Sequence, residues 1–172
     1  MEKLHLVYDF ADRSPSYGNA LFPLLFVAIG IGVFLYHKKF VDSSSTSMLG
    51  INKRKYGMVF GIIFASFGGL ICVILIPSMF SDYSNTKSIY LEKKYQTTEG
   101  TVENYHPMPE SGHDSERFTV NGVEFEFSDF DLSDYGYNNA ASHGGAIKAG
   151  IEVRIGYFNN GHKNVILKLE TE

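Results

Sequence analysis

Two long stretches of this chain carry no Asp, Glu, Lys, Arg or His, and they constrain its fold more than any other feature. One lies between Arg13 and His37 and the other between Lys55 and Asp82. Each is long enough to cross the hydrocarbon core of a bilayer as a helix, at about 1.5 Å per residue. Neither has the charged face that a helix of this length needs in a soluble protein. We therefore expect a membrane α-helical hairpin, with transmembrane helices over residues 18–37 and 56–80.

The first stretch differs from a cleaved signal peptide. A signal peptide has its positive residues before the apolar region and a small-residue cleavage site after it. Here the basic residues follow the apolar region, as His37-Lys38-Lys39, and no Ala-x-Ala pattern comes after them. We expect an uncleaved helix that anchors the chain in the lipid bilayer.

Basic residues near the two helices predict the orientation. The loop over residues 38–55 carries five Lys or Arg against a single Asp. The tail over residues 1–17 carries two, and the connector over residues 81–98 carries three. Because the most basic short loops stay in the cytoplasm, we expect this loop there. Both termini then lie outside the cytoplasmic (inner) membrane.

Small residues recur along one stripe of the second helix, where they allow another helix backbone to approach closely. The first helix offers a shorter set. Two interpretations stay open: the helices pack on each other within the hairpin, or the stripe drives homo-oligomerisation. The residues of the two sets are Gly57, Gly61, Ala65 and Gly69, with Ala28 and Gly32.

Beyond the connector, the apolar period changes to two, which predicts an extracytoplasmic all-β domain over residues 99–172. Asn121-Gly122 between two alternating runs is the strongest hairpin signal, with strands over residues 118–120 and 123–127. We expect further strands over residues 100–105, 151–157 and 164–169, and one helical turn within residues 129–150. About five short strands favour a small OB-like barrel or sandwich. An open sheet packed on the membrane helices is the alternative.

Two short motifs in this domain resemble a known family. Glu99-Gly100-Thr101-Val102 begins the domain, and Gly150-Ile151-Glu152-Val153-Arg154-Ile155-Gly156-Tyr157 resembles a G-x-x-V-x-V-x-Y strand. With two preceding membrane helices, the chain resembles the DUF3592 group of small bacterial membrane proteins. The chain has Phe158-Asn159-Asn160 where that group often has proline. The resemblance implies a fold and a membrane location only, because the group has no established general activity.

No motif predicts a cofactor or a catalytic site. His106, His113, His143 and His162 lack the spacing of a metal site, and the single Cys72 lies in the second apolar stretch. The segment around Asp129 lacks the glycine and the final glutamate of an EF-hand. Ser142 and His143 are adjacent, so they cannot face each other as nucleophile and base. We expect no enzymatic activity.

The predicted outer domain is acidic. Residues 81–172 hold eight Lys or Arg and fifteen Asp or Glu, a balance of −7. This balance disfavours nucleic acid, which needs a basic surface, and favours a cationic protein partner. The residues expected on such an acidic surface are Asp129, Asp131, Asp134, Glu124 and Glu126.

Three functions follow from this pattern. The first is a non-enzymatic membrane-anchored interaction module, whose β-domain binds a protein or envelope component outside the cytoplasmic membrane. The second is an immunity protein that neutralises a toxin acting in the membrane or periplasm. The third is a metal- or carboxylate-dependent envelope hydrolase.

The orientation is testable with paired reporters fused after Glu172, one active only outside the cytoplasm and one only inside. Because the loop over residues 38–55 is the most basic segment, we expect activity only from the outside reporter. Activity only from the inside reporter would reverse the orientation.

Overall fold

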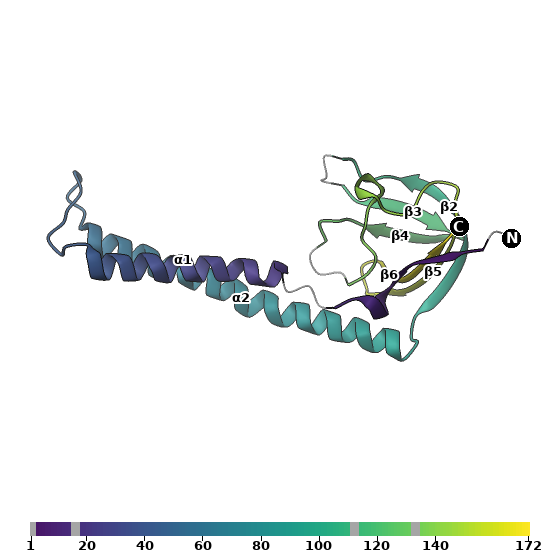
Figure 1. Ribbon diagram of the computed structural model, residues 1–172, viewed down its shortest axis with the longest axis horizontal. Helices are drawn as coiled ribbons and strands as arrows, with labels where there is room; N and C mark the ends of the chain where they lie inside the picture. The colour runs from purple at the N-terminus through teal and green to yellow at the C-terminus, as the bar shows by residue number, and fades with distance from the viewer. Residues whose placement is uncertain (1–2, 15–17, 111–113, 132–134) are drawn as a thin grey trace. The chain divides into compact units, whose positions relative to one another are not determined.

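The computed structural model describes residues 3–14, 18–110, 114–131 and 135–172 (Figure 1). The chain divides into two compact units. Pro15–Phe80 form a helical unit, and Met1–Ser14 together with Ser81–Glu172 form a β-rich unit. The β-rich unit is thus assembled from both ends of the chain.

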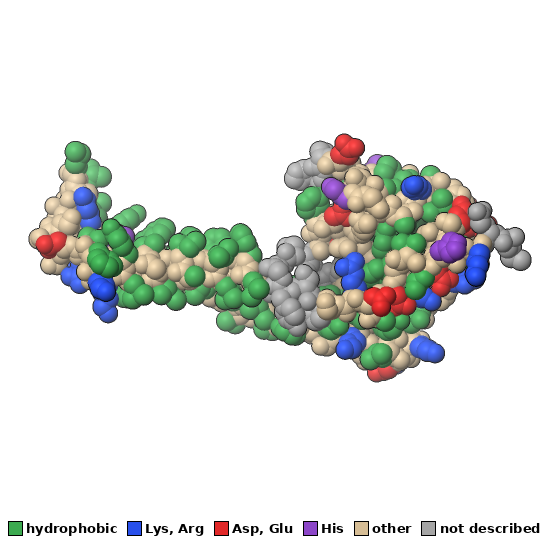
Figure 2. Space-filling view, in the orientation of Figure 1, with side chains coloured by type: hydrophobic (Ala, Val, Ile, Leu, Met, Phe, Trp, Pro, Cys, Tyr) green, Lys and Arg blue, Asp and Glu red, His purple; other side chains and the backbone are tan. Residues whose placement is uncertain are grey.

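The helical unit is a hairpin of two helices. Helix α1 spans Gly18–Phe40, and helix α2 begins at Lys53 and runs to Leu91. Both are long and apolar enough to cross a membrane. Most of their apolar side chains are left uncovered by the protein, for example Leu25, Phe67 and Val73 at 56, 55 and 72% exposure. Figure 2 shows hydrophobic side chains along the hairpin.

Glycines bring α1 and α2 into backbone contact. A Cβ atom added at Gly61 would lie 2.6 Å from the Gly30 carbonyl oxygen, and one at Gly68 would lie 2.7 Å from the Phe26 Cβ atom. A Cβ atom at Gly57 would overlap the His37 ring. A side chain at Gly61 or Gly68 would therefore displace the α1 backbone, and one at Gly57 would displace the His37 ring.

Half of the small residues singled out from the sequence lie in this contact. Gly57 and Gly61 face α1, and the Ala65 backbone packs on Gly30. Gly69 and Gly32 have no atom within 4 Å of an added Cβ, and Ala28 is exposed. A strict step of four residues drifts around a helix with 3.6 residues per turn. The contact therefore passes to Gly68, and Gly30 takes the place expected for Ala28 and Gly32.

Helix α2 continues past the predicted end at Phe80 and passes through Pro77. Its last turns, from Ser81 to Leu91, belong to the β-rich unit. Thr86 is buried there, and Tyr83, Ile89 and Tyr90 pack against the core of the sheet. This packing stabilises helical structure in residues 81–91, which were predicted from the sequence only as part of a connector.

The β-rich unit contains one six-stranded sheet in the order β1-β6-β5-β2-β3-β4, with every pair antiparallel. The strands are β1 His5–Asp9, β2 Gln96–His106, β3 Glu116–Val120, β4 Val123–Phe127, β5 Glu152–Asn159 and β6 Asn164–Thr171. The predicted hairpin at Asn121-Gly122 is confirmed: both residues have positive φ, 49° and 79°, as a two-residue turn requires. The predicted helical turn is the 3₁₀ helix η2, Ala141–His143.

Two features differ from the sequence expectation. The tail contributes a sixth strand, β1, in which Tyr8 is buried while Leu6 and Val7 are exposed, and Phe10, at the start of the following 3₁₀ helix η1 (Phe10–Asp12), is also buried. The hydrogen-bonded order leaves β1 and β4 as free edges, so the sheet is open. The open sheet does not confirm the expected OB-like barrel.

Strand β2 pairs with two different strands along its length. Its residues 96–101 pair with β5, and the rest, from Val102 to His106, pairs with β3. The register shifts between Glu103 and His106, where Asn104 has φ 50°. Such a bulge bends a strand. The β3–β4 hairpin therefore turns over the sheet, and the Phe125 ring packs against the Tyr157 ring of β5 at 5.3 Å.

The helix contact generates a prediction with a matched control. Gly61→Leu forces the two backbones apart, so we expect it to destabilise the hairpin by about 1–3 kcal/mol. Gly32→Leu, which has open space, is expected to change stability by less than about 0.5 kcal/mol. The measurement is the SDS mole fraction at which helical circular dichroism is lost. Equal midpoints for the two variants would contradict the contact.

Candidate functional site

The β3–β4 hairpin presents two unlike faces because its side chains alternate. Glu116, Phe118 and Val120 of β3 are buried, and Arg117 between them is exposed. On β4, Phe125 and Phe127 are buried, while Glu124 and Glu126 are exposed. The hairpin therefore contributes its aromatic face to the core and its charged face to the surface.

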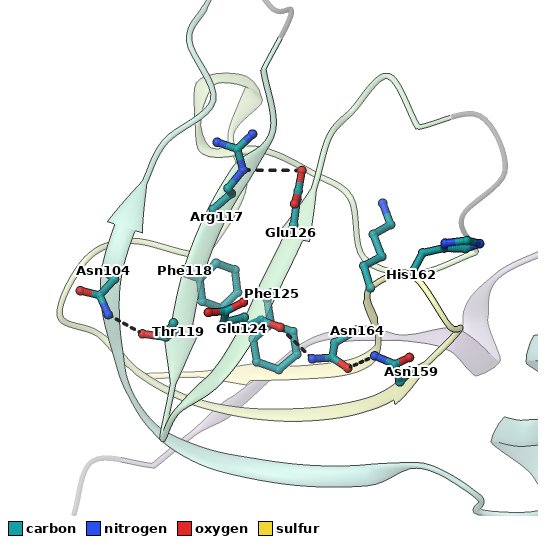
Figure 3. A pocket seen from close by; sticks show the side chains of 11 residues that line it. Asn104, Arg117, Phe118, Thr119, Glu124, Phe125, Glu126, Asn159, His162 and Asn164 are labelled. Atoms are coloured by element: carbon teal, nitrogen blue, oxygen red, sulfur yellow. Dashed lines mark hydrogen bonds and ion pairs between the residues drawn. The ribbon is translucent and has the colours of Figure 1, made fainter.

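A groove of 420 Å³ lies between this hairpin and the β5–β6 turn (Figure 3). Its hairpin side includes Arg117, Thr119 and both exposed glutamates of β4. Its other side is formed by Asn159, His162, Lys163 and Asn164. Segments about forty positions apart in the sequence thus form the two walls of one groove.

Hydrogen bonds fix the walls of the groove. The Asn164 Nδ2 amide donates to the Glu124 carbonyl oxygen at 2.8 Å, and the Asn159 amide donates to Asn164 Oδ1 at 3.0 Å. On the hairpin side, Asn104 Nδ2 donates to Thr119 Oγ1 at 3.0 Å. These amides position the polar lining without carrying charge.

Ion pairs surround the groove. Arg117 Nη2 lies 2.7 Å from Asp114 Oδ1, and its Nε lies 3.6 Å from Glu126 Oε1. Lys163 Nζ lies 2.7 Å from Asp131 Oδ2. Among the described residues, the Glu124 carboxylate has no ion-pair partner. It is therefore the charge most available to a bound molecule.

A second hollow of 480 Å³ adjoins the first, and the two share Arg117. It lies where β4 ends, and its lining includes Asp114, Ser128 and Asp131. Phe130 also lines it, with 64% of the residue exposed. An exposed aromatic ring beside charged groups is a common anchor in protein interfaces.

A different cluster of carboxylates lies beneath the loop over residues 140–147. Glu116 Oε2 accepts from the Ala141 N–H at 2.8 Å, and Asp129 Oδ1 accepts from the Ala140 N–H at 2.6 Å. The Tyr137 hydroxyl accepts from the Ala146 N–H at 2.8 Å. Tyr105 Oη donates to the Ile147 carbonyl at 3.3 Å. Side chains from separate segments thus fasten this loop, which gives the cluster a structural role.

Burial changes the acidity of this cluster. Desolvation raises the pKa of the Glu116 carboxyl, although the Ala141 N–H acts to lower it. Desolvation, with the Glu116 carboxylate nearby, raises the pKa of Tyr105 to about 12. Burial also raises the pKa of Tyr137. Each shift favours the neutral form, as expected for groups removed from water.

The residues predicted as an acidic surface divide between these two places. Glu124 and Glu126 line the groove, and Asp131 lies at its rim with Lys163. Asp129 is turned toward the 140–147 loop, where its Oδ2 also lies 2.5 Å from His143 Nδ1. Asp134 lies outside the described residues. The surface is therefore mixed in charge, because Arg117 and Lys163 are interspersed with the acids.

The histidines considered as metal ligands do not converge among the described residues. His106 pairs with Asp114 at 3.2 Å, His143 pairs with Asp129, and His162 lines the groove. His113 is not among the described residues. The part of the chain that the structure describes has no group of three or more His, Cys, Asp or Glu placed to hold a metal.

Sequence reasoning did not find Arg117, Asn159, Lys163 and Asn164 as site residues. Arg117 had one usable signal, because it alternates with Glu116 and Phe118 in a strand that pairs with β4. The other three lie at the β5–β6 turn, Asn159 before it, Lys163 within it and Asn164 after it, and the place of this turn opposite β4 depends on the bend of β2. None of the family models, curated proteins or solved structures compared with the chain matches it. The resemblance to the DUF3592 group stays a prediction.

The pKa shifts generate a prediction with opposite signs at two carboxyls. The raised pKa of Glu116 means that its contribution to stability is lost as pH rises through that pKa. Relative to wild type, Glu116→Gln should therefore gain free energy of unfolding as pH rises toward neutral. The Ser115 N–H and His106 lower the pKa of Asp114 from its ordinary value of 3.8, so Asp114→Asn should lose free energy of unfolding relative to wild type as pH rises toward that value, below the range in which Glu116→Gln gains it.

Denaturant unfolding of the full chain in non-ionic micelles, followed by tyrosine fluorescence, measures both differences. The chain has no Trp to obscure the tyrosine signal. The same sign of pH dependence for both variants would contradict the burial argument for Glu116.

Proposed function

We propose that this chain is a non-enzymatic membrane-anchored interaction module, with α1 and α2 in the cytoplasmic membrane and the β-rich unit binding a protein partner outside it. The observation that carries the proposal is the groove along β4, lined by charged and polar side chains from two separate hairpins. A membrane anchor and a surface groove together suit a protein that recruits or senses a partner at the membrane.

The anchor is supported by the surface of the hairpin. Large apolar side chains such as Phe22, Ile63 and Ile74 are 61, 63 and 61% exposed. Contiguous apolar surface of this kind is disfavoured in water and satisfied by lipid.

The orientation gains support from the sheet. Strand β1 precedes α1, and β6 follows α2, yet Leu6 pairs with Glu170 in the same sheet. With two helices crossing the membrane, the segments before α1 and after α2 then lie on the same side of it. Since the basic loop over residues 38–55 favours the cytoplasm, that side is the outside.

The groove has the composition of a protein-binding surface. It combines ionisable groups, amides and the edges of Phe118 and Phe125, and the exposed Phe130 ring lies in the adjoining hollow. Mixed polar lining with an aromatic anchor is typical of interfaces between proteins.

Site-specific photo-crosslinking in living cells tests the proposal. A benzoylphenylalanine residue at Thr119 or His162 in the groove is expected to capture a discrete partner protein. The matched control is Lys148, which is exposed and does not line the groove. Capture should be at least about tenfold stronger from the groove positions, because crosslinking requires close and lasting contact.

The comparison with Lys148 decides whether the groove binds a partner. Equal capture from Lys148, or capture from none of these positions, would contradict a binding role for the groove. The membrane orientation can be measured in the same strain with the reporter fused after Glu172.

A further inference from the structure

The loop between α1 and α2 is the most specific unassigned feature of the helical unit. It forms an ordered turn, because Thr46 and Asn52 make a β-bridge and the Ser47 N–H donates to the Ile51 carbonyl oxygen at 2.9 Å. A second backbone bond closes the turn, and the tip of the loop is therefore held as residues 47–50.

Two large apolar side chains project from this tip. Met48 is fully exposed, and Leu49 is 85% exposed. Removing apolar side chains of this size from water is favourable, yet the described part of the chain leaves both of them uncovered. The ordered turn therefore presents an apolar surface that is better suited to lipid or to another molecule than to water.

Basic side chains gather at the base of the same loop. Arg54 Nη2 donates to the Lys38 carbonyl oxygen at 2.9 Å, so it joins the end of α1 to the start of α2. The first turn of a helix ordinarily favours acidic side chains, but α2 has none there. The cations in the last turn of α1 and the first turn of α2 are Lys38, Lys39, Lys53, Arg54 and Lys55.

The loop bends to one side of the hairpin, so its tip lies beside the helix ends (Figure 1). Figure 2 shows hydrophobic side chains at the tip, and Lys and Arg side chains nearer the helices. Basic residues at the ends of membrane-spanning helices lie at the level of the lipid headgroups. A tip beside these helix ends therefore lies within reach of the membrane interface.

We propose that this loop is a binding site for acidic phospholipids, in which Met48 and Leu49 insert into the interfacial layer and the five cations bind the phosphate headgroups. The proposal rests on the membrane anchor of the proposed function and adds a lipid ligand to it. Apolar insertion and attraction of Lys and Arg to anionic lipid reinforce each other at a membrane surface.

An acidic protein with an apolar pocket is the alternative occupant. The membrane is favoured because α1 and α2 already hold the loop beside the headgroups, which gives the lipid a high effective concentration. A separate protein must instead lose its translational and rotational freedom to bind. A second copy of the loop fits poorly, because two clusters of cations repel each other.

Fluorescence quenching by lipid tests the insertion in the full chain, reconstituted in nanodiscs in which about a third of the lipid is phosphatidylglycerol. Cys72→Ala removes the native thiol, and Leu49→Cys carries an environment-sensitive fluorophore. The matched control carries the same fluorophore on Ser43→Cys, an exposed polar position outside the tip. We expect phosphatidylcholine with a nitroxide near its headgroup to quench position 49 at least about twofold more than position 43.

Substitutions at Met48 isolate the apolar contribution, with the fluorophore kept at position 49. Met48→Leu retains an apolar side chain and should change the quenching by less than about 1.3-fold, whereas Met48→Asn should reduce it at least about twofold. Replacing phosphatidylglycerol with phosphatidylcholine should also reduce it at least about twofold, because the headgroups then carry no net charge. Inorganic phosphate should reduce it no more than chloride at equal ionic strength, since the ligand is a lipid surface.

Several outcomes would overturn the proposal. These are equal quenching at positions 49 and 43, equal quenching for the Leu and Asn variants, no effect of phosphatidylglycerol, or a selective effect of inorganic phosphate. Photo-crosslinking of position 49 to a protein in cells, without lipid-dependent quenching, would assign the loop to a protein partner instead. Capture of a partner from Thr119 or His162 tests the groove separately and would stand in each of these cases.

Discussion

The bend in β2 is the constraint on which the β-rich unit depends. One strand pairs with β5 through residues 96–101 and with β3 from Val102 onward. The change of partner lies between Thr101 and Val102, and the bulge at Asn104 then bends the part of β2 that pairs with β3. Because β3 and β4 then turn over the sheet, Phe125 meets Tyr157 in the core. The same turn leaves β4 at the end of the hydrogen-bonded order and sets it beside the start of β6, where Asn164 bonds the Glu124 carbonyl, so one bend creates both the aromatic contact and the groove.

Features set by local sequence were predictable, and features set by distant contacts were not. Asn121-Gly122 predicted its hairpin because the turn depends only on the φ preferences of two residues. Strand β1 was missed because Tyr8 is its single buried side chain, which is too few to establish a period. The step of four residues placed Gly57 and Gly61 correctly but not Gly69, since the helical drift accumulates. Glu124 and Glu126 were expected on the surface, whereas the wall at Asn159 and Asn164 depends on the β2 bend.

The two acidic clusters show that the position of a carboxylate in the alternation of a strand decides whether it is buried or exposed. Glu116 is in phase with Phe118 and Val120, so its carboxylate is buried and binds the Ala141 N–H. Glu124 and Glu126 have the opposite phase to Phe125, so they remain in solvent. A buried carboxylate that satisfies backbone N–H groups stabilises a loop, and an exposed one recruits cations. Counting acidic residues alone mixes these roles, which is why Asp129 was grouped with surface residues.

The pairing of β1 with β6 also sets an order of events during biosynthesis. Strand β1 leaves the ribosome before both long helices, and its partner β6 leaves after them. Between them the chain must form both long helices and the rest of the sheet. Strand β1 therefore stays unpaired until β6 has been synthesised. A chain truncated before Asn164 would retain its hydrophobic hairpin but could not complete its sheet, which would mark it for the proteases that remove incomplete proteins.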